Sequence, residues 1–402
     1  MLNTATIKEY AYELGFDTAR ISSAEAFPEA ERVIKERIAQ GLMDGLPWFT
    51  AERADVSCHP DALLPDARSI ISLAMFYLTE QPDDENAGTD NAQGPRGRIS
   101  RYAWGDDYHE VIKPKLQQFA LWLRQYARGE INGELETRLF VDTGRMVDRA
   151  VAQRAGLGWY GKNTNILTKG WGSWVFLAEI VTNLPLAADT PTRANCGSCE
   201  ICLHACPTQA FPAPYVLDNT RCISYLTIEL RGSIPIELRP SMGNLIFGCD
   251  ICQQVCPVNK VVEKRLGFRK EAGEAGQLLQ VRRREEFRPR AGIGSNPELI
   301  PLLSLTEEQF RERFRSSPIR RTKRRGLLRN VCVALGNSGD PLAVPALVNA
   351  LSDYEPLVRG HAAWALGRIG GDQAIGALKD ALLVESDEEV RKETGYALQM
   401  KK

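Results

Sequence analysis

The sequence predicts an α/β domain, then a small cysteine-rich module and a C-terminal domain of α-helical repeats. Strand-like and helix-like segments alternate over roughly the first 185 residues. Eight of the ten cysteines fall between positions 196 and 256, and a motif recurs after 31 residues near the C-terminus. A chain of 402 residues exceeds one ordinary core. We place the domains at 1–188, 189–265, 266–320 and 321–402, the third being an irregular basic connector.

The elements of the first domain follow from the spacing of its apolar residues. The stretch SIISLAMFYL at 69–78 is apolar along almost its whole length, which is typical of a buried strand. Shorter runs predict further strands over 17–22, 137–142 and 173–183. Apolar residues at helical spacing predict helices over 3–15, 29–40, 107–127 and 144–156, and the polar stretch 80–97 predicts a loop.

Composition favours a soluble globular protein. Hydrophobic residues make up 44% of the chain, charged residues 25%, and the net charge is −1. No apolar run reaches the roughly 18 residues of a membrane span, and the N-terminus MLNTATIKEYAYELGF lacks the apolar core of a signal peptide. We therefore expect a cytoplasmic monomer with no membrane partner, in which disulfides rarely persist.

The clustered cysteines indicate a metal centre. The first motif, C-x2-C-x2-C-x3-C-P, covers 196–207; three more cysteines precede Pro257, and Cys222 lies between the groups. Zinc is the alternative, because C-x2-C pairs also bind it. The longer motif is more specific for two [4Fe–4S] clusters, with the cysteine before each proline ligating the other cluster. The predicted ligand sets are Cys196, Cys199, Cys202 and Cys256, and Cys206, Cys222, Cys249 and Cys252.

The C-terminal domain contains a repeat and follows a basic run. Segments 334–351 and 365–382 align, and a partial third copy begins near Glu388; this period is typical of HEAT-like repeats. The run 311–329 holds nine Arg or Lys and one Glu. It is either a solvated helix face or, since acidic partners are scarce, a surface for nucleic-acid phosphates. The candidate RNA-binding residues are Arg320, Arg321, Lys323, Arg324 and Arg325.

Taken together, the motifs resemble the epoxyqueuosine reductase family over nearly the whole chain. The matching stretches are CGSCEICLHACPTQAF, RCISYLTIE, GCDICQQVCPVNK, FVDTGRMVDRAVAQRAGLGWYGKN, RYAWGDDYHEVIKPKL and LLPDARSIISLAM. The resemblance implies reduction of epoxyqueuosine to queuosine at the wobble position of tRNA, the last step of queuosine synthesis. It also implies a cobalamin-binding domain similar to the reductive dehalogenase core. Electrons would pass from an unidentified low-potential donor through two [4Fe–4S] clusters to cobalamin.

The resemblance also implies roles for single residues. Removing the epoxide oxygen requires a proton donor, and the family's acid matches Asp142, whose pKa should be raised by burial. The alternative role for Asp142 is to cap the following helix. Family contacts to cobalamin fall on Asp142, Arg53, Ser100 and Ile166, while Ser224 and Asp250 border the cluster beside the corrin. Arg53 could equally be a surface charge, Ser100 a turn residue and Ile166 a core residue.

Two other functions compete with this interpretation. A cobalamin reductase acting on a small molecule, such as a dehalogenase, leaves the basic run and the repeats unexplained. An electron carrier docked through its repeats has no need of the large α/β domain. Bound cobalamin would separate the reductases from the carrier, and a salt-sensitive complex with tRNA would separate the two reductases.

Overall fold

The computed structural model describes residues 3–80, 94–129, 133–267 and 284–400. The chain forms two compact units built from interleaved segments. The first unit comprises Met1–Thr79, Asp107–Thr220 and Ile251–Glu286, and the second comprises Glu80–Asp106, Arg221–Asp250 and Phe287–Lys402. The predicted loop at 80–97 and the predicted connector at 266–320 lie partly outside the described residues.

The first unit is organised around a four-stranded sheet in the order β1–β2–β7–β4, with every pairing antiparallel. Its strands are β1 (Thr18–Ser23), β2 (Ser69–Phe76), β4 (Thr137–Phe140) and β7 (Val175–Thr182). Every residue of β2 is buried, which confirms the prediction from its apolar run. Both faces of the sheet are therefore covered, and neighbouring residues along a strand point to opposite faces.

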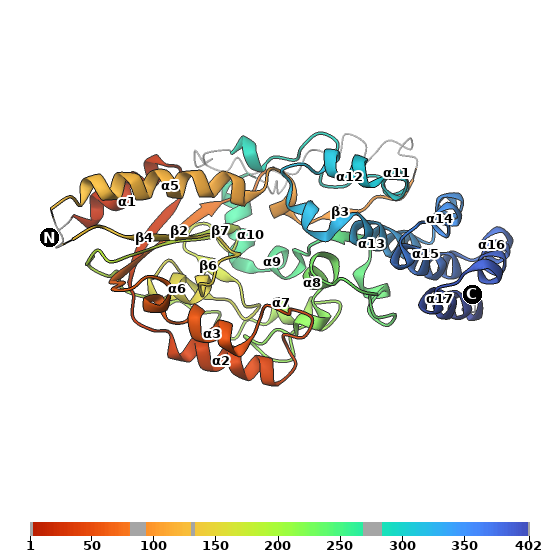
Figure 1. Ribbon diagram of the computed structural model, residues 1–402, viewed down its shortest axis with the longest axis horizontal. Coiled ribbons are helices and arrows are strands. Elements are labelled where there is room, and N and C mark those ends of the chain that lie inside the picture. Colours follow the sequence, from red (N-terminus) through yellow and green to blue (C-terminus); the bar gives the residue numbers. More distant parts are fainter. Residues whose placement is uncertain (1–2, 81–93, 130–132, 268–283, 401–402) are drawn as a thin grey trace. The chain divides into compact units, whose positions relative to one another are not determined.

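Helices cover the two faces of this sheet (Figure 1). Helices α1 (Thr4–Glu13) and α5 (Tyr108–Tyr126) pack on one face, and α6 (Asp148–Arg154) packs on the other. Further helices are α2 (Pro28–Ala39), α3 (Ala51–Ser57) and α4 (Pro60–Leu63). Strands β5 (Gly158–Tyr160) and β6 (Ile166–Thr168) form a hairpin. The cysteine segments of this unit contribute α7 (Ile201–His204), α9 (Ile251–Gln254) and α10 (Pro257–Arg265).

The second unit combines a short parallel pair of strands, β3 (Arg98–Ile99) and β8 (Leu245–Phe247), with helices. Helix α8 (Ile223–Ile228) packs on β8, and so does α13 (Lys323–Ser338). Part of the predicted irregular connector is in fact helical, as α11 (Leu299–Leu303) and α12 (Glu307–Arg313). The signal for α12 was present in the sequence, because Thr306 and Gln309 form a capping box at its start.

The repeats form α13, α14 (Val344–Ala350), α15 (Pro356–Ile369), α16 (Asp372–Val384) and α17 (Glu388–Gln399). The glycine of the repeated Ala-Leu-Gly motif explains their close packing. A Cβ on Gly336 would lie 2.9 Å from Cα of Ala365, and one on Gly367 would lie 2.7 Å from the carbonyl oxygen of Ala397. The two glycines are one repeat apart, so only glycine at this position allows successive helices to approach.

Three further observations concern two buried cysteines, one buried tryptophan and the length of the helices. Cys58 and Cys332 are both fully buried. Trp104 is 4% exposed and donates a hydrogen bond to the Ile99 carbonyl at 2.8 Å, so it is a core residue of the second unit. No helix within the described residues is long and apolar enough to cross a membrane.

Candidate functional site

Asp142 lies in the loop that connects β4 to α6. Its backbone is in the left-handed region, with φ of 52°, a conformation that aspartate tolerates better than most residues. Helix α6 starts only at Asp148, and its N-cap position is Val147. The helix-cap alternative for Asp142 is therefore wrong. The side chain is 52% exposed, so the expected apolar burial of this carboxyl is not provided by the chain itself.

The first turn of α5 holds the Asp142 carboxyl in place. The Tyr108 hydroxyl donates a hydrogen bond to Oδ2 of Asp142 at 2.5 Å. The Tyr108 ring is itself fixed, because it stacks on Phe176 of β7 with 4.4 Å between ring centroids. Sequence reasoning did not assign Tyr108 to the site, although the polar stretch DDYHE at a predicted helix start was a usable signal.

His109 adds a second polar contact near the same carboxyl. Its Nε2 lies 4.0 Å from Oδ2 of Asp142 and 3.4 Å from the Thr143 hydroxyl. Its Nδ1 lies 2.9 Å from Oδ1 of Asp107, the N-cap of α5. Burial opposes ionisation of Asp107, but its hydrogen bonds to His109 prevail and lower the pKa of that carboxyl. An ionised Asp107 therefore orients the imidazole, with Nε2 facing the Asp142 loop.

Arg53 holds the same loop through its backbone. This residue lies in α3, and its Nη2 donates to the Gly144 carbonyl oxygen at 2.7 Å. A Cβ on Gly144 would lie 2.5 Å from the Phe140 ring, so the loop also needs glycine here. The structure thus brings Arg53 and Asp142, both predicted cofactor contacts, to one loop. Arg53 is therefore more than a free surface charge, because its guanidinium donates a hydrogen bond to the backbone of this loop.

The first predicted ligand set lies together within the first unit. Burial raises the pKa of the Cys202 thiol to about 11, and the neighbouring thiols of Cys256, Cys196 and Cys199 raise it further. Burial also raises the pKa of Cys256, with further contributions from Cys196 and Cys199. Thiols that raise one another's pKa repel as thiolates, and a bound cationic centre removes that repulsion. The residues therefore fit a thiolate-ligated cluster.

The second predicted ligand set is divided between the two units. In the first unit, Cys206 Sγ accepts the Ala210 amide at 3.3 Å, and Nδ2 of Asn165 lies 4.0 Å from Cys252 Sγ. Amide donors to sulfur are a common feature of iron–sulfur ligands. In the second unit, Cys222 is the N-cap of α8 and Cys249 precedes Asp250. Assignment of these four cysteines to one cluster remains a prediction.

Two other predicted cofactor contacts meet within the second unit. The Ser100 hydroxyl donates to Oδ1 of Asp250 at 2.6 Å, and the Arg101 amide donates to Oδ2 at 2.7 Å. Burial raises the pKa of Asp250, although these hydrogen bonds oppose the shift. Gly248 permits the contact, because a Cβ there would lie 2.4 Å from Cβ of Ser100. Ser100 is therefore a buried partner of Asp250, while Ser224 lies partly buried in α8.

Ile166 occupies a core position. It is 4% exposed in β6 and packs in an apolar cluster with Ala74, Ala152 and Leu157. This position agrees with the alternative interpretation of Ile166 as a core residue.

The basic run separates into surface and buried residues. Arg320, Arg321 and Lys323 are exposed, although Arg321 Nε lies 2.6 Å from Oε1 of Glu229. Arg325 is partly exposed and lies 3.9 Å from Glu355. Arg324 was wrongly placed on the predicted RNA surface: its side chain is 6% exposed and forms an ion pair with Asp353. The reason is that Arg324 lies on the core-facing side of α13.

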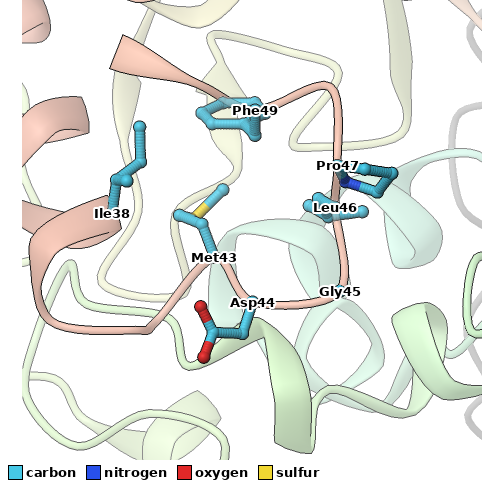
Figure 2. A pocket seen from close by; sticks show the side chains of 7 residues that line it. All are labelled: Ile38, Met43, Asp44, Gly45, Leu46, Pro47 and Phe49. Atoms are coloured by element: carbon cyan, nitrogen blue, oxygen red, sulfur yellow. The ribbon is translucent and has the colours of Figure 1, made fainter.

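An apolar hollow lies elsewhere in the first unit, between α2 and the segment before α3. Figure 2 shows its lining side chains, which are Ile38, Met43, Asp44, Gly45, Leu46, Pro47 and Phe49. Asp44 supplies the one carboxylate of this lining. Sequence reasoning had not singled out this segment, and nothing in its lining suggests catalysis.

Comparisons with known proteins agree with this arrangement. Residues 58–143 match the family described as "Epoxyqueuosine reductase QueG, DUF1730". Residues 195–259 match a 4Fe-4S double cluster binding domain, and 320–399 match HEAT repeats. Epoxyqueuosine reductase of Pseudomonas aeruginosa is 39% identical over 91% of this chain and 94% of its own length. The Bacillus subtilis enzyme is 35% identical over 98% and 95%.

Solved structures give the same result. An epoxyqueuosine reductase in complex with an epoxyqueuosine-modified tRNA-Tyr stem loop has a TM-score of 0.86 and 34% identity, covering 99% of this chain and 98% of that one. A Bacillus subtilis epoxyqueuosine reductase structure has the same TM-score and identity, and covers 99% of each chain. In that structure the loop of a catalytic aspartate has swung out of the active site.

Proposed function

Because this chain belongs to the epoxyqueuosine reductase family, we propose that it reduces epoxyqueuosine to queuosine at the wobble position of tRNA, with Asp142 as the proton donor. The match extends over at least nine-tenths of the chain and of the relatives. Neither a small-molecule dehalogenase nor a docked electron carrier accounts for similarity of this extent. The chain is accordingly an oxidoreductase.

The overall chemistry defines what the protein must supply. Removing the oxygen of an epoxide breaks two C–O bonds, forms a C=C bond and releases water. The balance requires two electrons and two protons. The double-cluster domain at 195–259 provides a route for single electrons. The protons must come from side chains placed at the leaving oxygen.

The geometry of Asp142 supports its role as the acid. Its carboxyl is half exposed, yet the Tyr108 hydroxyl fixes one oxygen. Arg53 holds the loop through Gly144, and His109 lies beside it. A carboxyl that is both accessible and oriented can deliver a proton to a bound substrate. The swung-out aspartate loop of the Bacillus subtilis protein is consistent with such a group being carried on a movable loop.

The family resemblance also implies cobalamin, and the residues near Asp142 fit a polar rim for it. The half-exposed carboxyl can accept hydrogen bonds from the amide groups at the edge of a corrin. Arg53 would hold that carboxyl's loop in position. When bound, cobalamin supplies a strongly reducing cobalt centre. Ser100 and Asp250, in the second unit, form a buried polar contact of their own.

The exposed part of the basic run is the proposed tRNA contact. Arg320 and Lys323 lie on the surface of the second unit, and Arg321 and Arg325 contribute charge beside their acidic partners. Such side chains bind phosphates with little regard for base sequence. The related reductase bound to a tRNA stem loop supports a substrate of this class.

The proposal can be tested with purified protein. Protein prepared without oxygen would be loaded with clusters and cobalamin, then given a low-potential reductant and an epoxyqueuosine stem loop. Mass spectrometry of the digested nucleosides should show loss of one oxygen. Asp142→Asn should slow conversion about 100-fold or more while retaining both cofactors. Asp66→Asn is a matched control, since Asp66 also has a positive φ, of 58°. Unslowed conversion by Asp142→Asn would remove Asp142 from the mechanism.

A further inference from the structure

Two carboxyl groups lie on the face of the sheet that α6 covers: that of Glu179, and that of Asp148, which is partly buried. Glu179 is in the middle of β7 and is fully buried. It is directly opposite Ser72 of β2 and Phe140 of β4. Asp148 is the first residue of α6, and its carboxyl lies against that of Glu179. Phe140 precedes Asp142 by two residues and Asp148 follows it by six, so one stretch of chain joins the pair to the proposed acid.

The pair lacks the partners that buried carboxyls usually have. Within the described residues, no group hydrogen-bonds either carboxyl oxygen of Glu179, Oδ1 of Asp148 or the Ser72 hydroxyl, and all four atoms are buried. Their surroundings are apolar: the residues on either side on the same face, Ile70 with Val181 and Ala74 with Leu177, belong to two hydrophobic clusters. Unpaired buried carboxylates are costly, and most are neutralised by a proton.

Two ionised carboxylates can only accept hydrogen bonds, so neither satisfies the other. With one proton between them, one carboxyl donates to the other and both gain a partner. Burial raises the pKa of Asp148 to about 7, with Glu179 lowering and Asp142 raising it. Burial also raises the pKa of Glu179 well above its ordinary value, and Asp148 and Asp142 raise it further. Like charges that share a site cannot both ionise readily.

The charged and titratable groups around the pair come from each neighbouring element. Arg149 of α6 and Arg53 of α3 favour ionisation of Asp148, and Asp142 opposes it. Tyr160 of β5 also senses Asp148, but burial raises the pKa of its hydroxyl to about 12, so it stays neutral. Across the sheet, Arg20 of β1 lies opposite Ser72 and contacts Asp189 at 3.5 Å. The charges around Asp148 therefore act on its ionisation in both directions.

We propose that Asp148 and Glu179 share one proton and donate it to Asp142 during turnover. This inference rests on the proposed function. The reaction consumes two protons with two electrons from the low-potential donor, and one carboxyl at Asp142 holds only one proton. Asp142 protonates the oxygen as the first C–O bond breaks, and the pair then reprotonates Asp142. The second proton lets that oxygen leave as water when the C=C bond forms, and solvent afterwards restores both protons. The pair acts through Asp142 and does not touch the substrate.

Two readouts on the complete, cofactor-loaded protein test this inference. In infrared difference spectra recorded between pH 5 and 9, the wild type should show a protonated-carboxyl band that titrates near neutral pH (about 7 for Asp148). Glu179→Gln should change the frequency and the titration of that band. It should also lower kcat for stem-loop conversion by at least about 10-fold without changing KM. The alkaline limb of the pH–rate profile of this variant should also shift, because Glu179 no longer contributes to the pKa of Asp148.

Asp148→Asn is the second variant, and Asp66→Asn is the control that should change neither readout. If Glu179→Gln fails to take up clusters, Asp148→Asn decides alone. A wild type without the infrared band, or pair variants with unchanged kcat and pH profile, would overturn the inference while the proposed function stands. A wild type that converts no substrate would instead overturn the proposed function, and with it the resupply step, whatever the infrared band shows.

Discussion

Each unit of the protein buries charged side chains, and one group of them in each unit makes a useful comparison. In the second unit, two buried arginines have hydrogen-bond partners: Arg324 pairs with Asp353, and Arg329 donates to the carbonyl oxygens of Leu226, Leu230 and Gly232. In the first unit, Asp148 and Glu179 retain buried oxygens without partners among the described residues. Matched buried charges hold a fold together, whereas an unmatched carboxyl pair is suited to gaining and losing a proton.

The two units also differ in how firmly their exposed charged side chains are held. Asp142 is half exposed but oriented by Tyr108. Arg320 and Lys323 are exposed on the repeat side of the second unit. An oriented acid is what a chemical step needs, while loosely held cations suffice for phosphate binding. The first unit is therefore expected to govern kcat and the second to govern tRNA affinity.

The largest expected effect tests whether the buried pair acts only through the surface acid. Asp142→Asn should reduce kcat about 100-fold or more. Adding Glu179→Gln to that variant should cause little further loss, because a proton reserve has no use without the group that it supplies. The measurement is a double-mutant cycle in single-turnover conversion. Multiplicative losses in the double variant would show that the pair and Asp142 act independently.

A second prediction concerns the matched charges of the second unit. Arg324→Ala should lower the free energy of unfolding by about 3–5 kcal/mol, because it leaves Asp353 buried without its partner. Arg320→Ala, a neighbouring surface arginine, should change stability by less than about 0.5 kcal/mol. Denaturant unfolding of both variants measures the difference. Equal stability of the two would contradict the structural role assigned to Arg324.

A third prediction concerns how the stability of the protein depends on pH through Asp148. Burial raises the pKa of Asp148 from 3.8 to about 7 in the folded state. A carboxyl whose pKa is higher in the folded state contributes its full stability below the pKa of the unfolded state. That contribution is lost as pH rises through the pKa of the folded state. Unfolding free energy should therefore fall by a few kcal/mol between about pH 4 and 7. Glu179→Gln should flatten this decline, as measured by thermal unfolding across that range. A slope unchanged by Glu179→Gln would contradict the shared proton.

The smallest expected effect concerns the surface cations. Replacing Arg320 and Lys323 together by alanine should weaken tRNA binding several-fold, and the salt dependence of the binding constant should become shallower by about one to two charges. Conversion by substrate already bound should be unaffected, because these residues are assigned to affinity. Fluorescence anisotropy at several salt concentrations measures both quantities. An unchanged salt dependence would place the tRNA surface elsewhere.

Sequence spacing was most informative where the chemistry depends on local order. The cluster cysteines and the Ala-Leu-Gly repeat are separated by fixed numbers of residues, so their roles could be predicted. The contact between Tyr108 and Asp142 joins residues 34 positions apart, and no local pattern specifies it. Arg324 looked equivalent to its basic neighbours until the helix face was known. Glu179 did leave a signal, as the lone charge in the apolar run SWVFLAEIVTN, but its pairing with Asp148 required the fold.

The most direct test of the account is a single turnover by the wild-type protein, loaded with both clusters and cobalamin and reduced chemically before the epoxyqueuosine stem loop is added. The modified nucleoside is expected to lose one oxygen and become queuosine, at a rate that falls as pH rises above neutrality. A fully loaded, reduced protein that binds the stem loop but leaves the nucleoside mass unchanged would contradict it.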